Sequence, residues 1–141
     1  MIYLDTSVIV PFYLPEALSI AVRELLEIEE QPALSQLVEV EMFSALSRRV
    51  RMGEISLEQA RQITAQFQVH LNDGFYTRIA LEPVHYQQAR QWIGRFDTPL
   101  RTLDALHLAI AASNNLPLIT ADETLANAAN ILAVEVQLLT P

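Results

Sequence analysis

The chain has 141 residues, a formal net charge of −8 and no cysteine. This length is enough for one domain with a sizeable buried core, and we expect a single domain over residues 1–141. The acidic balance argues against nucleic-acid binding through a broadly basic surface, and the missing cysteines exclude disulfides and thiol chemistry.

The basic and apolar residues exclude further classes of protein. All nine basic residues are arginines, so Schiff-base chemistry and a P-loop lysine are excluded. No apolar run is long enough to cross a membrane, and no positively charged apolar leader opens the chain. Together with the absence of cysteine, these features predict a cytoplasmic protein.

Short apolar stretches alternate with helical patterns along the chain. A brief β-rich run at 2–4 predicts the first strand, and the other expected strands are 33–35, 77–81, 118–120 and 133–138. The expected helices are 8–13, 16–30, 37–52, 57–71, a helix opened by Pro83, 102–114 and 123–130. Gly53 suits a helix end, and Ser56 with Gln59 matches a capping box. Strands alternating with helices predict a parallel sheet covered on both faces.

Four carboxylates lie inside or beside apolar sequence. Asp5 follows the first expected strand, and Asp122 closes the strand at 118–120. Ligands of parallel α/β sheets bind beyond the carboxyl ends of the strands, so both acids stand where chemistry usually occurs. Glu41 lies within an apolar helical stretch, and Asp104 is in the first turn of an otherwise apolar helix.

Each of these acids also has a purely structural interpretation. Asp5 and Asp122 suit helix N-caps, Asp104 suits the amino-terminal end of a helix dipole, and Glu41 can extend to the surface. A cap is worth only ~1 kcal/mol, whereas two carboxylates ~6 Å apart repel by roughly 3 kcal/mol at an effective dielectric of ~20. A convergent cluster therefore requires a cation or raised pKa values. Its hard oxygen ligands favour Mg²⁺ or Mn²⁺.

Four segments carry a more specific signal through their order along the chain. They are Tyr3-Leu4-Asp5-Thr6-Ser7-Val8, Glu41 with Ala45-Leu46, Leu103-Asp104-Ala105-Leu106-His107-Leu108-Ala109, and Leu118-Ile119-Thr120-Ala121-Asp122 with Leu125. In this order and spacing, the whole chain resembles the PIN-domain family, and most of all the VapC-type ribonuclease toxins of bacterial toxin–antitoxin pairs.

The resemblance implies an α/β fold, namely a PIN-like three-layer αβα sandwich around a parallel sheet of about five strands in order 3-2-1-4-5. It implies that Asp5, Asp104 and Asp122 hold Mg²⁺ or Mn²⁺ and that Glu41 completes the catalytic set. The implied activity is metal-dependent hydrolysis of RNA. The implied partners are an RNA substrate, a cognate antitoxin protein and further copies of the chain, in a homodimer or higher assembly.

One departure and one rival accompany the resemblance. Many members carry a further acid two residues after the position of Asp122, where this chain has Thr124. The neighbouring Glu123 is a candidate substitute, so the number of metals stays open. Glu39 competes with Glu41 on register, and Glu41 is preferred because the Ala45-Leu46 pair follows it at the family's spacing.

Other residues keep two interpretations each. Thr6 and Thr120 are supporting hydroxyls or turn residues, and His107 either assists the site or is a helix residue satisfied locally. The arginines are RNA contacts or favourable charges at helix ends and on the surface; they are Arg48, Arg49, Arg51, Arg95 and Arg101. The apolar stretch from Val8 to Leu26 predicts a partner surface.

Two rival functions remain beside the nuclease. One is a catalytically weak or inactive PIN-like module that binds RNA or protein. The other is a phosphoacceptor or phosphatase of similar topology. The absence of lysine, and of a second aspartate two residues after Asp5, counts against the latter.

Overall fold

The strands form one parallel sheet in the computed structural model, which describes residues 1–141. Its order is β3-β2-β1-β4-β5, and every neighbouring pair runs parallel. The predicted α/β class and strand order are therefore confirmed. The strands are β1 (Ile2–Leu4), β2 (Pro32–Ser35), β3 (Thr77–Ile79), β4 (Leu118–Thr120) and β5 (Val136–Leu138).

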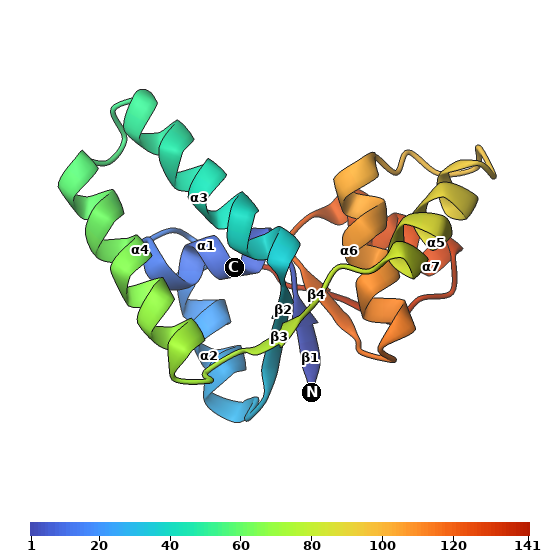
Figure 1. Cartoon of the computed structure of the whole chain (residues 1–141), viewed down its shortest axis with the longest axis horizontal. Coiled ribbons are helices and arrows are strands. Elements are labelled where there is room, and N and C mark those ends of the chain that lie inside the picture. The colour runs from blue at the N-terminus through green and yellow to red at the C-terminus, as the bar shows by residue number, and fades with distance from the viewer.

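Helices cover both faces of the sheet, as Figure 1 shows. Those that connect β1, β2 and β3 lie on one side: α1 (Thr6–Tyr13), α2 (Ser19–Ile28), α3 (Gln36–Arg51) and α4 (Leu57–Asn72). The remaining helices lie on the other side: α5 (Pro83–Ile93), α6 (Thr102–Ser113) and α7 (Glu123–Ile131). This division follows from right-handed crossovers, because the chain moves in one direction along the sheet from β1 to β3 and then returns past β1 to β4 and β5.

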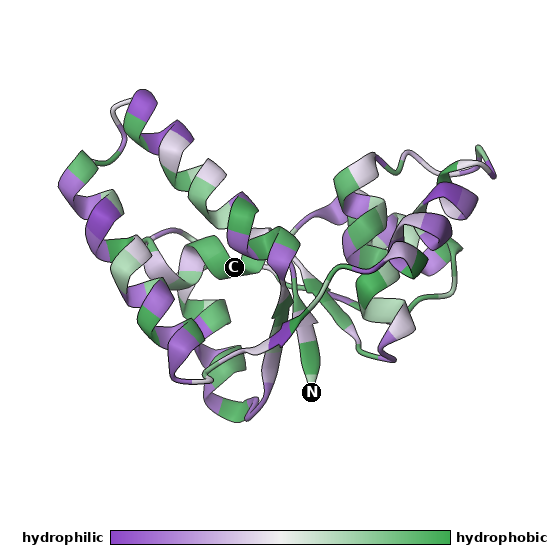
Figure 2. Ribbon diagram, in the orientation of Figure 1, coloured by the Kyte–Doolittle hydropathy of each residue, from purple (hydrophilic) through white to green (hydrophobic).

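The core lies between the sheet and these helices. β1 and β4 are buried along their whole length, as expected for inner strands of a covered parallel sheet. In α6 every residue from Ala105 to Ala111 is buried, because the helix packs between the sheet and α5. Figure 2 shows the apolar residues gathered on these inner surfaces, with hydrophilic residues outward. Burial of each large aliphatic side chain contributes roughly 1.5–3 kcal/mol.

Helix ends follow the sequence signals. Ser56 Oγ accepts a hydrogen bond from Gln59 N at 3.0 Å, and Gln59 Oε1 accepts one from Ser56 N at 2.8 Å, which completes the predicted capping box. Gly53, just after α3, has φ of 73°. Only glycine adopts this left-handed conformation without strain, so the tight connection from α3 to α4 depends on it.

Several boundaries differ from the expected ones. The strand expected at 77–81 ends at Ile79, and the one expected at 133–138 begins at Val136. The helix expected at 16–30 covers only Ser19–Ile28. The first helix, expected at 8–13, covers Thr6–Tyr13 and has Pro11 buried inside it. That helix continues two residues beyond it, because its apolar side chains pack into the core.

The apolar stretch near the amino terminus is mostly inside the protein. Val8, Ile9 and Val10 are buried, as is Val22 of α2. The prediction of a partner surface over Val8 to Leu26 is therefore wrong for most of this stretch. The helices on this side of the sheet cover these apolar residues.

No helix is both long and apolar enough to cross a membrane.

The sheet order places one special point between β1 and β4. These neighbouring strands pair with Leu4 opposite Ile119, and the connections that follow them leave in opposite directions. Such a switch point opens a crevice beyond the carboxyl ends of the strands. Asp5 directly follows β1, and Asp122 follows β4 by two residues. Both acids therefore stand at this crevice.

Candidate functional site

Asp5 is held by hydrogen bonds that link three elements. Its Oδ1 accepts from the backbone N of Ser7 at 3.1 Å and from Ser7 Oγ at 2.5 Å. Its Oδ2 accepts from Thr120 Oγ1 at 2.5 Å, so the carboxylate ties β1 and α1 to β4. Asp5 is only 4% exposed. Burial raises the pKa of Asp5, while the hydrogen bonds from Ser7 and Thr120 act to lower it.

Asp122 caps α7 at the next strand end. Its Oδ1 accepts hydrogen bonds from the backbone N of Thr124 at 2.9 Å and of Leu125 at 3.2 Å. Its own backbone N donates to Thr120 Oγ1 at 3.0 Å. Asp5 and Asp122 are thus true N-caps, and Thr120 joins them directly. The structural interpretation of these two acids is therefore confirmed, and both caps also stand at the strand ends where the functional interpretation needs them.

Glu41 reaches the same place from α3. Its Oε1 accepts a hydrogen bond from Thr6 Oγ1 at 2.9 Å and a short one from His107 Nε2. Burial acts to raise the pKa of Glu41, but the bond and charge of His107, together with the Thr6 bond, hold it below its ordinary value. The rival Glu39 points elsewhere and binds Arg78 with two hydrogen bonds, at 2.7 and 3.1 Å. Of the two glutamates, Glu41 is the one that joins the site.

Asp104 approaches from the first turn of α6. Burial raises the pKa of Asp104 above its ordinary value, and the negative charges of Asp122 and Glu41 raise it further. No hydrogen bond lowers it, although the charges of His107 and Arg101 act in that direction. This carboxylate therefore repels its neighbours without any structural bond in compensation. A helix-dipole role alone does not account for that arrangement.

A buried chain of hydrogen bonds supports Glu41 from behind. Tyr3 Oη lies 2.8 Å from Ser35 Oγ and 2.7 Å from His107 Nδ1. The other ring nitrogen of His107 meets Glu41, and His107 is only 3% exposed. Burial raises the pKa of Tyr3 well above its usual range, so its phenol keeps its proton. The interpretation of His107 as a helix residue satisfied locally is wrong, because both of its partners are distant in the sequence.

The four predicted acids thus meet at one edge of the sheet, though they are bound differently. Asp5 and Asp122 are fixed by caps, Glu41 by two side-chain donors, and Asp104 by none. Thr6 and Thr120 are both supporting hydroxyls, as one interpretation had it. Ser7 and Tyr3 also support the site, by hydrogen bonds to Asp5 and to His107, and neither role was predicted from the sequence. The one available signal was their position beside Asp5 in the first segment.

The acids offer oxygen ligands and closely spaced negative charge, the donor chemistry that hard divalent cations prefer. As the side chains are oriented here, no three acidic or histidine groups surround a single point closely enough to hold an ion. The fit therefore rests on donor type and on the unrelieved repulsion at Asp104. The residues suit a divalent cation in kind, and Asp104, which makes no hydrogen bond, is the acid freest to turn toward one.

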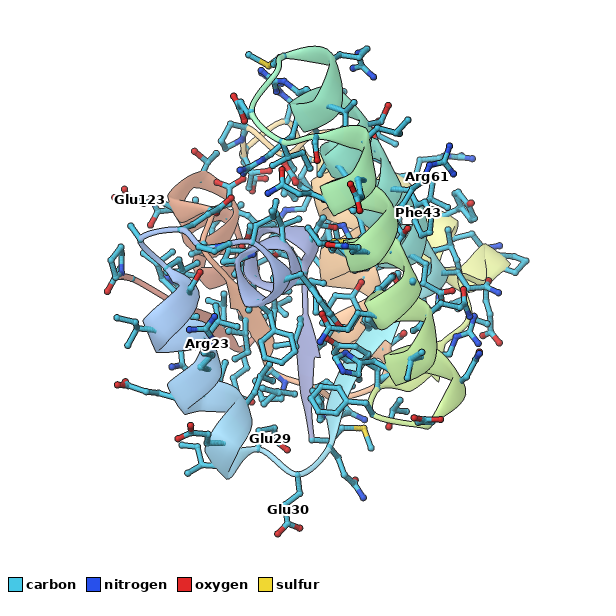
Figure 3. The ribbon with its side chains drawn as sticks, turned by 90° about the vertical axis from the view of Figure 1, so that its left-hand side faces the viewer. Arg23, Glu29, Glu30, Phe43, Arg61 and Glu123 are labelled. Atoms are coloured by element: carbon cyan, nitrogen blue, oxygen red, sulfur yellow. The ribbon has the colours of Figure 1, made fainter.

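The position two residues after Asp122, where many family members carry an acid, has a neutral residue in this chain. Thr124 stands there, and its backbone N is used in capping α7. The candidate substitute, Glu123, is exposed and projects outward at the edge of the molecule in Figure 3. Glu123 therefore adds no ligand at the crevice in this arrangement.

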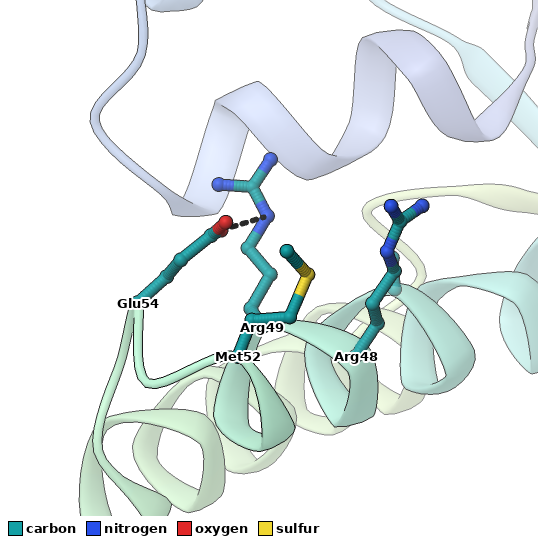
Figure 4. A pocket seen from close by; sticks show the side chains of 5 residues that line it. Arg48, Arg49, Met52 and Glu54 are labelled. Atoms are coloured by element: carbon teal, nitrogen blue, oxygen red, sulfur yellow. Dashed lines mark ion pairs between the residues drawn. The ribbon is translucent and has the colours of Figure 1, made fainter.

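The arginines near the end of α3 have different surroundings. Arg49 forms ion pairs with Glu16 and, at 3.8 Å, with Glu54. In Figure 4 Arg48 stands apart from the pair between Arg49 and Glu54, along a cavity of about 310 Å³. Arg51 donates a hydrogen bond to Ser47 Oγ at 2.8 Å. Arg49 is thus a structural link, whereas Arg48 is the arginine here best placed for an external anion.

The loop before α6 carries two more arginines. Arg95 pairs with Asp97 at 2.7 Å, which supports the structural interpretation for this residue. Arg101 directly precedes α6, and its positive charge acts to lower the pKa of Asp104. Arg101 therefore lies close enough to influence the acidic site electrostatically.

Stability should depend on pH in opposite senses at two of these acids in metal-free protein. The pKa of Asp104 is raised in the folded state, so its contribution is full below the unfolded pKa and is lost as pH rises. The pKa of Glu41 is lowered, so its contribution is present at higher pH and is lost in acid. Relative to wild type, Asp104→Asn should gain stability from about pH 4 to pH 7, while Glu41→Gln should lose it.

Urea unfolding at a series of pH values in the presence of chelator measures both differences. Parallel curves for the two variants would contradict the assigned environments. Asp73→Asn serves as a control for exposed acids, because Asp73 lies at the far end of α4 and its side chain is exposed.

The comparisons with known proteins agree with this architecture. The sequence matches the model of the PIN domain family over residues 2–131. Since this match spans nearly the whole chain, the protein belongs to the PIN domain family. A search of the curated proteins found no match.

Solved structures with the same fold include several toxin–antitoxin proteins. FitAcB from Neisseria gonorrhoeae has a TM-score of 0.75 and 21% identity, covering 96% of each chain. VapC20 of Mycobacterium tuberculosis, described as a toxin that cleaves the sarcin-ricin loop, has a TM-score of 0.73 and 19% identity, covering 91% of this chain and 95% of that one. DNA-bound VapBC of Salmonella typhimurium has a TM-score of 0.72 and 17% identity, covering 99% and 100%. The fold is therefore that of the VapC-type toxins.

Proposed function

We propose that the protein is a metal-dependent endoribonuclease and the toxin of a toxin–antitoxin pair. One observation carries the proposal: in a PIN domain, four acids meet at the switch point of the sheet, and one of them is repelled by its neighbours without a hydrogen bond. Such an arrangement costs folding free energy in the absence of a cation. Residues that cost stability while gathering at a crevice are typical of active sites.

The proposed metal ligands are Asp5, Asp104 and Asp122, with Mg²⁺ or Mn²⁺ as the ion. When bound, such an ion supplies a Lewis acid that stabilises charge on phosphoryl oxygens and activates water. The chain's own contribution is to hold the carboxylates in place. The hydroxyl of Thr120 donates a hydrogen bond to Asp5 and accepts one from the backbone N of Asp122. A single side chain therefore sets the relative position of two proposed ligands.

Glu41 has the proposed role of orienting the attacking water. Its Oε1 is occupied by Thr6 and His107, which leaves Oε2 for a water or a substrate hydroxyl. A carboxylate with a lowered pKa is a weak base, so it favours orientation of the water over removal of its proton. The proton leaving the water would pass to solvent at the open side of the crevice.

RNA binding would depend on few positive charges, because the net charge is −8. Arg48 beside its cavity and Arg101 beside Asp104 are the proposed phosphate contacts. Arginine suits this task because its guanidinium group binds phosphate oxygens in pairs. Since electrostatic attraction over the whole surface is unfavourable, recognition would rely on the local site rather than on long-range steering.

The proposed partners are a cognate antitoxin and a second copy of the chain. Support comes from the fold, since a solved toxin–antitoxin complex from Klebsiella pneumoniae and the DNA-bound VapBC of Salmonella typhimurium have it. A cytoplasmic location and a single domain over residues 1–141 belong to the same proposal. A cognate antitoxin would block the acidic pocket with a basic side chain.

A second candidate is a PIN domain that binds RNA or protein without cleaving it. Two observations favour it: Thr124 stands where many members carry an acid, and no three side chains are already oriented around an ion. The phosphoacceptor alternative has no such support, because Ser7 occupies the position of its second aspartate. Metal-dependent cleavage separates the first two candidates.

The deciding experiment incubates purified protein with total cellular RNA and Mn²⁺ or Mg²⁺, beside a chelated sample. We expect discrete fragments only when metal is present, and sequencing their ends would map the cleaved bonds. If RNA is retained on the protein but never cut under either metal, the binding module is the correct function. In that case Thr124→Asp tests whether the missing acid is the cause.

A further inference from the structure

We infer that His107 is a positioning residue: held by Tyr3, it fixes the carboxylate of Glu41 in the orientation that the proposed ribonuclease reaction needs. This inference rests on the proposed function and extends it to residues outside the acidic set. Its basis is the continuous buried chain of side chains from Ser35 through Tyr3 and His107 to Glu41.

The direction of each hydrogen bond follows from the groups at the two ends. Ser35 Oγ accepts from the backbone N of Val38 at 3.4 Å, so its hydroxyl proton is free to donate to Tyr3 Oη. Tyr3 then donates to His107 Nδ1 at 2.7 Å. At the other end Glu41 is a carboxylate that only accepts. The proton on the ring must therefore be on Nε2, facing Glu41.

This assignment holds in either charge state of the ring. A neutral ring with its proton on Nε2 donates to Glu41, and an imidazolium does the same while its Nδ1–H donates to Tyr3 instead. The contribution of Tyr3 is to hold the ring plane through Nδ1, while the carboxylate of Glu41, which only accepts, excludes the tautomer in which Nε2 lacks a proton.

Packing shows why the ring keeps a single orientation. His107 is 3% exposed, and Tyr3 is fully buried on the central strand. Their ring centroids are 5.9 Å apart at an interplanar angle of 46°. Thr6, on α1, donates a second hydrogen bond to the same oxygen of Glu41. Two donors on one oxygen therefore stop the carboxylate from rotating, and its second oxygen stays directed away from them.

The other buried histidine shows that burial alone does not create this arrangement. His85 accepts a hydrogen bond from the backbone N of Glu82 at 2.9 Å, and its Nε2 lies 2.8 Å from Ser113 Oγ. These partners cap α5 and link it to the far end of α6. His85 contacts no member of the acidic site. It is therefore a matched control for the loss of a buried, hydrogen-bonded imidazole.

Three substitutions at position 107 separate positioning from packing. The amide nitrogen of glutamine can occupy the place of Nε2, so His107→Gln keeps a donor for Glu41 and loses the bond to Tyr3. The shorter side chain of asparagine reaches only the position of Nδ1, so His107→Asn keeps the hydrogen bond to Tyr3 and loses the one to Glu41. We expect kcat to fall about 10- to 100-fold in His107→Ala and His107→Asn, with KM little changed, and to recover in large part in His107→Gln.

The kinetic test uses an oligonucleotide spanning a bond mapped from cellular RNA, under Mn²⁺. His85→Gln should lower the melting temperature without lowering kcat. If His107 acts through Glu41, then adding His107→Ala to Glu41→Ala should cause no further loss. Full kcat in folded His107→Ala, or a larger loss in His107→Gln than in His107→Asn, would overturn the inference while leaving the nuclease assignment intact.

A second measurement does not require activity. The ¹⁵N chemical shifts of the histidine rings in the labelled protein report which nitrogen carries the proton, and the signals of His107 are assigned by their absence in His107→Gln. We expect Nε2 of His107 to be protonated. An unprotonated Nε2 would overturn the inference, because it cannot donate to Glu41. A wild-type protein that never cleaves RNA, yet has the protonated Nε2, would overturn the proposed function instead.

Discussion

Replacing Asp104 with asparagine is expected to reduce RNA cleavage by at least about 100-fold while the chain stays folded. The change removes one proposed ligand and its negative charge but almost none of its volume. Asp104 makes no hydrogen bond, and burial together with the charges of Asp122 and Glu41 outweighs the attraction of His107 and Arg101. We therefore expect removal of its charge not to destabilise the fold. The melting temperature should therefore stay the same or rise, and a gain of about 1 kcal/mol would raise it by roughly 3 °C in a chain of this size.

Initial cleavage rates measure the loss of activity. Thermal unfolding of the same preparations measures the change in melting temperature. Asp97→Asn is the matched control, because Asp97 lies in the loop before α6 and pairs only with Arg95. Its activity should equal that of wild type. An Asp104→Asn variant with full activity would remove Asp104 from the site, and one that fails to fold would refute the assignment of its environment.

Removal of divalent metal is expected to abolish cleavage and to lower the stability of wild-type protein. An ion that binds only the folded state adds RT ln(1 + [L]/Kd), or about 2.7 kcal/mol at a hundred times Kd. The effect should be large here because the ion would also relieve the repulsion around Asp104. Chelation followed by addition of Mn²⁺ or Mg²⁺, monitored by thermal unfolding and by RNA cleavage, measures both effects.

The same metal titration of the Asp104→Asn variant tests whether the ion binds at Asp104. With one ligand and one negative charge removed, its melting temperature should respond much less to Mn²⁺ than that of wild type. Asp97→Asn should respond as wild type does. Cleavage that continues undiminished in chelator, or equal thermal shifts in all three proteins, would exclude the proposed metal site.

Much of the fold was predictable from the sequence because local signals agree with the final packing. β1, β4 and the capping box at Ser56 are as predicted. The errors have a common cause in tertiary structure. The apolar residues Val8 to Val10 are interior, because helices distant in the sequence cover them.

The acidic site was predictable in part. Asp5 and Asp122 follow apolar strands, and parallel sheets gather such ends at one edge. The support behind Glu41 was not predictable, because Tyr3 and His107 are 104 positions apart and each suits an ordinary core position. No local pattern distinguishes a tyrosine that fills the core from one whose hydroxyl also holds a histidine. Such long-range pairs are visible only once the chain is folded.

The hydrogen bonds around Asp5 have a consequence for how sequences of this kind change over time. Loss of its carboxylate would leave the buried hydroxyl of Thr120 and the half-buried hydroxyl of Ser7 without their acceptor, which costs about 1–3 kcal/mol for a fully buried group. Loss of the Asp104 carboxylate would break no hydrogen bond and would remove a charge that its surroundings disfavour on balance, so we expect it to cost the fold far less. In a lineage released from selection for activity, selection for folding should therefore preserve the aspartate at position 5 long after the one at position 104 has gone. Among relatives, the acid at position 104 should distinguish working copies from decayed ones, and the acid at position 5 should not.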